Sequence, residues 1–207
     1  YEKIGGLLQF GIPTFKLEKS VLATRRGVLE GMGVEFRLGT EVGKDVTFAD
    51  LVAGFDAVFL GMGTYRYTDG QLPGQDLRNV LPALPFLVQN GRIVTGTDGA
   101  EGRPIAGWED QVALPDLRGK RVVVLGGGDT GMDCVRTARR LNPNGKVYCM
   151  YRRTEAEMLG RLEERLHAKE EGVIFEYLTL PIRFIGNERG EVVAAECVRM
   201  QLGAPDA

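Results

Sequence analysis

The stretch that decides the fold is KRVVVLGGGDTGMDCVRTARRL, residues 120–141. It opens with an apolar run at 120–125, which is typical of a buried parallel strand. Residues 129–141 then carry apolar side chains at helical spacing. Three glycines lie at the junction in the spacing G-x-G-x-x-G: Gly126, Gly128 and Gly131. A strand, a glycine turn and a helix in this order predict the phosphate-binding loop of a dinucleotide-binding βαβ unit.

Each of these glycines has an expected physical role. Gly126 would permit the tight turn after the strand, Gly128 would let a pyrophosphate approach the backbone, and Gly131 would let the helix pack closely on the sheet. The first turn of the helix would offer unpaired N–H groups and a positive dipole end to the phosphates. The alternative is a glycine-rich turn that binds no ligand, but the strand and the helix on either side favour the nucleotide.

The second strand of the unit, expected at 147–151, indicates which nucleotide binds. It is followed directly by Arg152 and Arg153. Sites that prefer NADH place an acidic residue here, which binds the ribose 2′-hydroxyl. Two guanidinium groups instead favour a 2′-phosphate, which they can hold with forked, charge-assisted hydrogen bonds. We therefore predict NADPH, although a solvated basic pair remains the alternative, and Glu155 and Glu157 would partly neutralise the arginines.

The rest of the chain alternates between helices and strands. Helices are expected at 16–31, 47–52, 80–90 and 161–171, and further strands at 34–38, 56–60, 173–180 and 192–200. Such alternation favours an α/β fold with Rossmann-like parallel sheets and crossover helices.

The first half of the chain carries a second set of nucleotide-binding features. Residues 1–3 read as the end of a strand, at which Glu2 would bind a ribose diol. The segment 5–8 (GGLL) would then pass close to the cofactor. The strand at 56–60 is expected to be buried and leads into a G-x-G that ends at Gly63, at the sheet edge where cofactors bind.

Composition excludes several classes of function. The 26 basic and 28 acidic residues give a net charge of −2, which argues against a nucleic-acid partner. No stretch reaches the roughly 18 apolar residues of a membrane span. The three cysteines have no metal-ligand spacing and read as reduced intracellular thiols: Cys134, Cys149 and Cys197. His167, the one histidine, is expected on the surface of a charged helix, so no catalytic triad, catalytic side chain or metal site is predicted.

Five stretches resemble the small-subunit family of NADPH-dependent glutamate synthases: GGLLQFGIPTFKLEK (5–19), AVFLGMGT (57–64), VVVLGGGDTGMDCVRTA (122–138), YRRTEAEM (151–158) and VRMQLGAPDA (198–207). The resemblance covers nearly the whole chain in the same order and weakens only at about 91–115. Dihydropyrimidine dehydrogenase and related flavin adaptor proteins share most of these stretches. The resemblance implies an NAD(P)-binding domain at 118–207, inserted in a partial FAD-binding domain at 1–90, with a linker at 91–117.

The resemblance also implies the roles of individual residues. Contacts to FAD would come from Glu2, Gly6, Leu7 and Gly63, and contacts to NADPH from Gly126, Gly128, Asp129, Thr130, Gly131, Arg152 and Arg153. In the family, NADPH passes hydride to FAD, and electrons leave through iron–sulfur clusters to a glutamate-forming large subunit in the cytoplasm.

Three parts of the family pattern are absent from the sequence: the N-terminal iron–sulfur cysteines, the first FAD phosphate loop and the C-terminal return of the FAD domain. We therefore expect a central fragment that is inactive alone and retains no FAD. Two alternatives stay open. The same fold would serve another reductase, or the segment would bind a nucleotide without catalysis.

Overall fold

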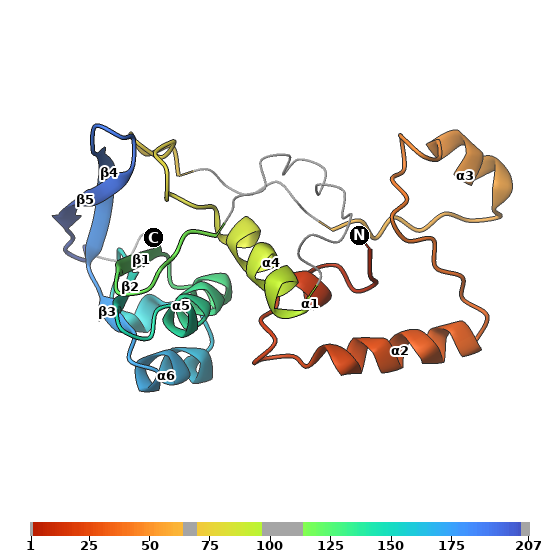
Figure 1. Cartoon of the computed structure of the whole chain (residues 1–207), viewed down its shortest axis with the longest axis horizontal. Coiled ribbons are helices and arrows are strands. Elements are labelled where there is room, and N and C mark those ends of the chain that lie inside the picture. Colours follow the sequence, from red (N-terminus) through yellow and green to blue (C-terminus); the bar gives the residue numbers. More distant parts are fainter. Residues whose placement is uncertain (1, 64–69, 97–113, 204–207) are drawn as a thin grey trace. The chain divides into compact units, whose positions relative to one another are not determined.

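The structure is a computed structural model that describes residues 2–63, 70–96 and 114–203 (Figure 1). The chain divides into two compact units: Tyr1–Thr68 with Val88–Gln111, and Asp69–Leu87 with Val112–Ala207. The domain bounds expected from the sequence stay a prediction.

A three-stranded parallel sheet forms the centre of the second unit. Its strands lie in the order β1 (Arg121–Leu125), β2 (Lys146–Met150) and β3 (Ile174–Glu176). The strands are linked by two helices: α5 (Asp129–Leu141) after β1, and α6 (Leu162–Glu170) after β2. Helix α5 packs on β1 and β2, and α6 packs on α5 (Figure 1). The predicted βαβ unit is therefore present, because parallel neighbours require such crossovers.

The core of this unit lies between α5 and the sheet. Met132 and Val135 of α5 are fully buried, as are Val147 and Cys149 of β2. Seven consecutive residues of α5, from Met132 to Ala138, are buried. An amphipathic surface helix buries only one face, so α5 must be covered by neighbours on more than one side.

An antiparallel hairpin follows the sheet. It consists of β4 (Thr179–Gly186) and β5 (Val192–Arg199). The single strand expected at 173–180 is wrong, because the chain breaks at Leu178, whose φ is 52°. A left-handed residue cannot continue a strand, so the chain leaves the parallel sheet there and enters the hairpin.

The regular secondary structure described in the first unit is helical. Its helices are α1 (Leu7–Phe10), α2 (Lys19–Gly31) and α3 (Phe48–Gly54), while α4 (Ala83–Val94) contributes residues to both units. Thr47 caps α3 as expected: its hydroxyl accepts from the Asp50 amide at 3.1 Å, and the Asp50 carboxylate accepts from the Thr47 amide at 3.2 Å. Phe10 is buried against α4, where a Cβ on Gly91 would lie 2.6 Å from the Phe10 carbonyl oxygen.

Two strands expected in the first unit are not formed. Residues 34–38 and 56–60 have no strand assignment, and the side chain of Phe59 is 94% exposed rather than buried. A strand needs a neighbour to accept its backbone hydrogen bonds, and neither segment pairs with another strand in the described ranges. The apolar pattern alone therefore predicted the wrong local structure.

No helix among the described residues is both long enough and apolar enough to span a membrane.

Candidate nucleotide-binding site

The glycine loop follows β1 directly and begins with a residue of positive φ. Gly126 has a φ of 111°, which favours glycine, and its N–H donates to the Met150 carbonyl of β2 at 3.0 Å. Gly128 is the N-cap of α5 and has no side chain to cap it. A Cβ placed on Gly126 or Gly128 would meet nothing within 4 Å. The loop therefore presents open backbone at the positive end of a 13-residue helix.

Other glycines of the site are required by close packing. A Cβ on Gly131 would lie 2.5 Å from the Gly126 carbonyl oxygen. Gly131 thus allows α5 to pack closely against the glycine loop. The sequence had predicted that it would allow close packing against the sheet. A Cβ on Gly160 would lie 2.9 Å from the Gly127 carbonyl oxygen, to which the Gly160 amide donates at 2.8 Å. The segment before α6 is therefore held directly against the glycine loop.

The two arginines lie in a second loop, at 151–158, which is closed by its own hydrogen bonds. The Tyr151 hydroxyl donates to the Glu157 carbonyl oxygen at 2.6 Å. The Thr154 hydroxyl donates to the Glu157 carboxylate at 2.6 Å, and the Thr154 amide donates to the same oxygen at 2.9 Å. This capping box starts a short 3₁₀ helix, η1 (Glu155–Glu157). The loop is therefore ordered without help from the arginines.

Arg152 and Arg153 are exposed on this closed loop. In the part of the chain that the structure describes, neither guanidinium group donates a hydrogen bond or forms an ion pair with another residue. Their loop adjoins the glycine loop, because a Cβ on Gly127 would lie 2.7 Å from the Cε of Met158 and 3.0 Å from the Cδ2 of Tyr151. The structure thus places the loop that carries the two arginines beside the glycine loop.

The carboxylates expected to neutralise the arginines have other partners. Glu155 accepts from the Lys169 ammonium of α6 at 2.6 Å, and this hydrogen bond lowers the pKa of Glu155. The hydrogen bond from the Thr154 hydroxyl lowers the pKa of Glu157, and the charge of Arg153 contributes further. Neither carboxylate forms a hydrogen bond or ion pair with Arg152 or Arg153 among the described residues, so both guanidinium groups can still bind an external anion.

A further ion pair lies at the first residue of α5. The Asp129 carboxylate accepts from the Arg161 amide at 3.0 Å, and its other oxygen lies 3.2 Å from Arg161 Nε. Thr130, the next residue of α5, is exposed. The sequence reasoning missed Arg161, because its relation to Asp129 depends on the packing of 158–161 along the glycine loop.

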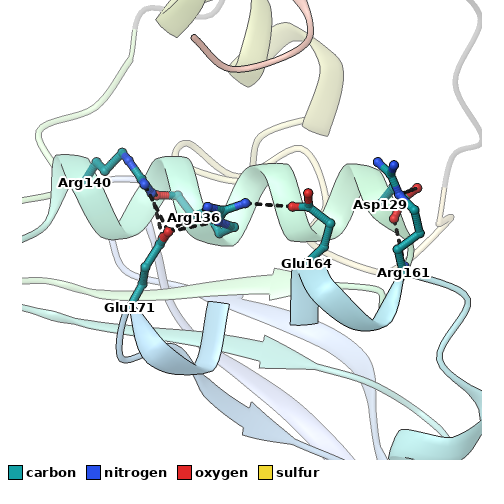
Figure 2. Close-up of polar contacts among 6 residues, drawn as sticks. All are labelled: Asp129, Arg136, Arg140, Arg161, Glu164 and Glu171. Atoms are coloured by element: carbon teal, nitrogen blue, oxygen red, sulfur yellow. Dashed lines mark hydrogen bonds and ion pairs between the residues drawn. The ribbon is translucent and has the colours of Figure 1, made fainter. Parts of the chain in front are cut away.

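A partly buried ionic network joins α5 to the start and end of α6 (Figure 2). Arg136 donates to Glu164 at 2.7 Å and to Glu171 at 2.8 Å, and Arg140 also donates to Glu171, at 2.6 Å. Burial acts to raise the pKa of Glu171, but the hydrogen bonds from the two arginines outweigh it and lower that pKa. The network fixes the position of α6 and therefore of the segment that precedes it.

The residues expected to contact FAD all lie in the first unit, and their role there stays a prediction. The Glu2 carboxylate lies 3.6 Å from the Nε of buried Arg92. Gly6 has a φ of 50° and is the N-cap of the four-residue helix α1, which begins at Leu7. Gly63 is exposed, with a φ of 72°. No hydrogen bond or ion pair between described residues joins Gly63 to the other three.

No other cluster with catalytic chemistry is found in the described ranges. No group of His, Cys, Asp and Glu side chains there could hold a metal ion. Burial raises the pKa of the Cys134 and Cys149 thiols to about 12, so both stay protonated. His167 is exposed on α6, as the sequence predicted.

The fold is shared with a known class of oxidoreductase. Two structures of FprA from Mycobacterium tuberculosis, a variant and a complex with NADPH, match 97% of this chain with TM-scores of 0.67 and 0.62. The chain covers 61% of FprA, and the sequences are 18% identical. This likeness confirms the predicted α/β class with a parallel Rossmann-like sheet.

Several curated proteins are much more similar to this chain in sequence than FprA is. The chain is 47% identical over 207 residues to the glutamate synthase [NADPH] small chain of Escherichia coli and 49% identical over 206 residues to that of Halomonas elongata. It is also 45% identical over 205 residues to the putative oxidoreductase UacF of E. coli. No family model matches the sequence. The predicted resemblance to the small chain of glutamate synthase is thus confirmed over the whole chain, which spans about two fifths of the length of these small chains: 42% and 41%.

Proposed function

We propose that this chain contains the NADPH-binding half of a flavin oxidoreductase, and that its parent protein is a glutamate synthase small chain. In that protein the module would take hydride from NADPH for FAD, and electrons would pass through iron–sulfur clusters to a large subunit that forms glutamate. Identity of 47–49% to two such small chains supports this assignment.

One observation carries the nucleotide preference. Arg152 and Arg153 stand beside the glycine loop, on a loop whose own carboxylates are occupied by Thr154 and Lys169. An unpaired cation pair at the end of the second strand suits the 2′-phosphate that distinguishes NADPH from NADH. The residues present therefore fit NADPH.

The protein's part in the reaction is to bind and orient. In the parent protein NADPH would supply a hydride, for which FAD would be the acceptor. The open backbone at Gly126 and Gly128 would hold the pyrophosphate, since no side chain lies within 4 Å of their Cβ positions. Arg152 and Arg153 would hold the adenosine 2′-phosphate. No side chain is needed as an acid or base for hydride transfer, because the cofactors carry the chemistry.

Calorimetric titration of the 207-residue chain with NADPH and NADH tests this proposal. The double substitution Arg152→Ala with Arg153→Ala is expected to reduce NADPH affinity by about tenfold or more, since a hydrogen bond to a charged group contributes about 1.5–3 kcal/mol. NADH affinity should change little. Arg189→Ala, in the exposed turn of the hairpin, is the matched control. Equal affinity of the unaltered chain for NADPH and NADH would reject the role of the two arginines.

The flavin part of the proposal has a separate test. Glu2, the residue expected to bind the FAD ribose, is paired with Arg92, and the expected strand at 56–60 is exposed. We therefore expect the purified chain to be colourless and to gain no flavin absorbance on incubation with FAD. A yellow, flavin-loaded protein would contradict this expectation.

A second candidate function follows from the comparison with UacF, whose 45% identity is close to that of the small chains. The same module would then deliver electrons to a different acceptor. Purification of the parent protein together with its bound partner distinguishes the two candidate functions, because only the first predicts that the partner is a glutamate-forming subunit.

A further inference from the structure

Arg161 occupies a position that local helix energetics disfavour. It is the N-cap of α6, where Ser, Thr, Asp or Asn is preferred, and its side chain makes no capping hydrogen bond. A cation at this end also opposes the positive end of the helix dipole. Glu163 and Glu164 in the first turn are favourable to that dipole, but Glu164 is paired with Arg136. The arginine therefore needs a reason beyond the stability of α6.

The side chain of Arg161 lies beside Asp129, the first residue of α5 (Figure 2). The preceding residue, Gly160, donates its amide to the Gly127 carbonyl oxygen at 2.8 Å. The Arg161 amide and Nε both contact the carboxylate of Asp129, the first residue of α5. The guanidinium group is therefore held beside the start of α5, where the backbone at Gly128 is open.

The pair between Arg161 and Asp129 is poorly suited to a structural role. Its side chains are 64% and 46% exposed, and exposed ion pairs contribute little to stability. The two helices are already joined by Arg136, which is 9% exposed and bonds Glu164 and Glu171. In the described chain, Asp129 is the one group that bonds the Arg161 guanidinium, and this uses Nε rather than the two Nη groups. Four N–H donors of Arg161 thus remain for a ligand.

We propose that Arg161 is a third cation of the nucleotide site and binds the pyrophosphate, with the Asp129 carboxylate as the anion that holds it when no ligand is bound. This inference rests on the proposed function. It divides the site in two: Arg161 recognises the diphosphate common to NADPH and NADH, whereas Arg152 and Arg153 recognise the 2′-phosphate. The Asp129 carboxylate itself opposes diphosphate binding, because it repels the ligand and competes for Arg161.

Two small probes separate these parts of the site. ADP carries the diphosphate and lacks the 2′-phosphate, and 2′-AMP carries the 2′-phosphate and lacks the diphosphate. Calorimetric titration of the 207-residue chain is expected to show that Arg161→Gln weakens ADP binding about tenfold and 2′-AMP binding less than about twofold. The double alanine variant at Arg152 and Arg153 should show the reverse pattern.

Asp129→Asn distinguishes ligand binding from a structural role. If Arg161 binds the diphosphate, this variant binds ADP at least as tightly as the unaltered chain. If the pair only joins the two helices, Asp129→Asn and Arg161→Gln weaken ADP binding alike, and the inference is overturned. Arg161→Lys, which keeps the charge, should retain most of the ADP affinity and serves if Arg161→Gln does not fold.

The failures of the two proposals differ. ADP affinity unchanged by Arg161→Gln, in a chain that still binds 2′-AMP, overturns the role of Arg161 alone. An unaltered chain that binds neither ADP, 2′-AMP nor NADPH overturns the proposed function together with this inference. Thermal unfolding of each variant shows whether it is folded under the titration conditions.

Discussion

The hydroxyl of Thr154 donates a 2.6 Å hydrogen bond to the carboxylate of Glu157, three residues further along the chain. This contact joins a side chain just after the two arginines to one just before the segment that contacts the glycine loop. It therefore orders the basic loop and lowers the pKa of Glu157, to which the charge of Arg153 also contributes.

Thr154→Ala tests whether this order matters for nucleotide preference. Loss of the cap should cost about 1 kcal/mol of loop stability, so that NADPH affinity falls several-fold while NADH affinity changes little. Thr154→Ser, which keeps the hydroxyl, should restore the preference. Calorimetric titration with both nucleotides measures the ratio. A lower melting temperature with an unchanged ratio would show that the cap acts on stability alone.

Two glycines of the site should respond differently to alanine. In Gly160→Ala the new Cβ would lie 2.9 Å from the Gly127 carbonyl oxygen, so the backbone must shift, at a cost of about 1–3 kcal/mol. In Gly128→Ala the Cβ enters open space, and φ is an ordinary −87°. We expect Gly128→Ala to unfold like the unaltered chain in urea yet to bind NADPH more weakly. Equal binding by that variant would show that the open backbone is not where the phosphates lie.

Arg136→Ala should be among the most destabilising substitutions in the second unit. It leaves Glu164, only 12% exposed, as a buried charge without its partner. Breaking such a pair costs about 3–5 kcal/mol. Arg26→Ala is the matched control, because its pair with Glu30 is exposed and should contribute less than about 0.5 kcal/mol. Urea unfolding measures both, and similar effects of the two substitutions would contradict the role given to the α5–α6 network.

The network also predicts how stability depends on pH. The pKa of Glu171 lies below its ordinary value of 4.5, because hydrogen bonds from Arg140 and Arg136 outweigh the opposite effect of burial. A carboxylate whose pKa is lowered by folding contributes its full stabilisation above the unfolded value and loses it as the pH falls through the folded value. The free energy of unfolding should therefore decrease in acid. In Glu171→Gln this part of the decrease should disappear, and an identical pH profile in both proteins would refute its origin.

The helix 129–141 could be predicted from sequence because its signals are local. The glycines before it, the apolar spacing within it and the turn after it all lie in one continuous stretch. The same holds for the cap at Thr47, whose partner Asp50 is three residues away. In both cases the interactions that form the element join near neighbours in the chain.

The strand expected at 56–60 failed for the opposite reason. An apolar run becomes a strand only if another segment pairs with it, and that information is not in the run itself. The candidate site also combines predictable and unpredictable features. The role of Arg152 and Arg153 could be predicted from their position directly after the second strand. The hydrogen bond from Lys169 to Glu155 could not, because Lys169 lies fourteen residues away on α6. The role of Arg161 likewise depends on a contact between residues 32 positions apart.

The continuous burial of α5 from Met132 to Ala138 has a consequence for how easily its backbone opens to solvent. Backbone amides exchange their hydrogens with solvent only when the structure around them opens. In α5 this requires the helix to leave both the sheet and α6, whereas α2 and α3 contain no buried residue and can fray by themselves. We therefore expect the buried part of α5 to exchange more slowly than α2 and α3, so that the helix whose first turn would receive the nucleotide phosphates is formed before the ligand binds.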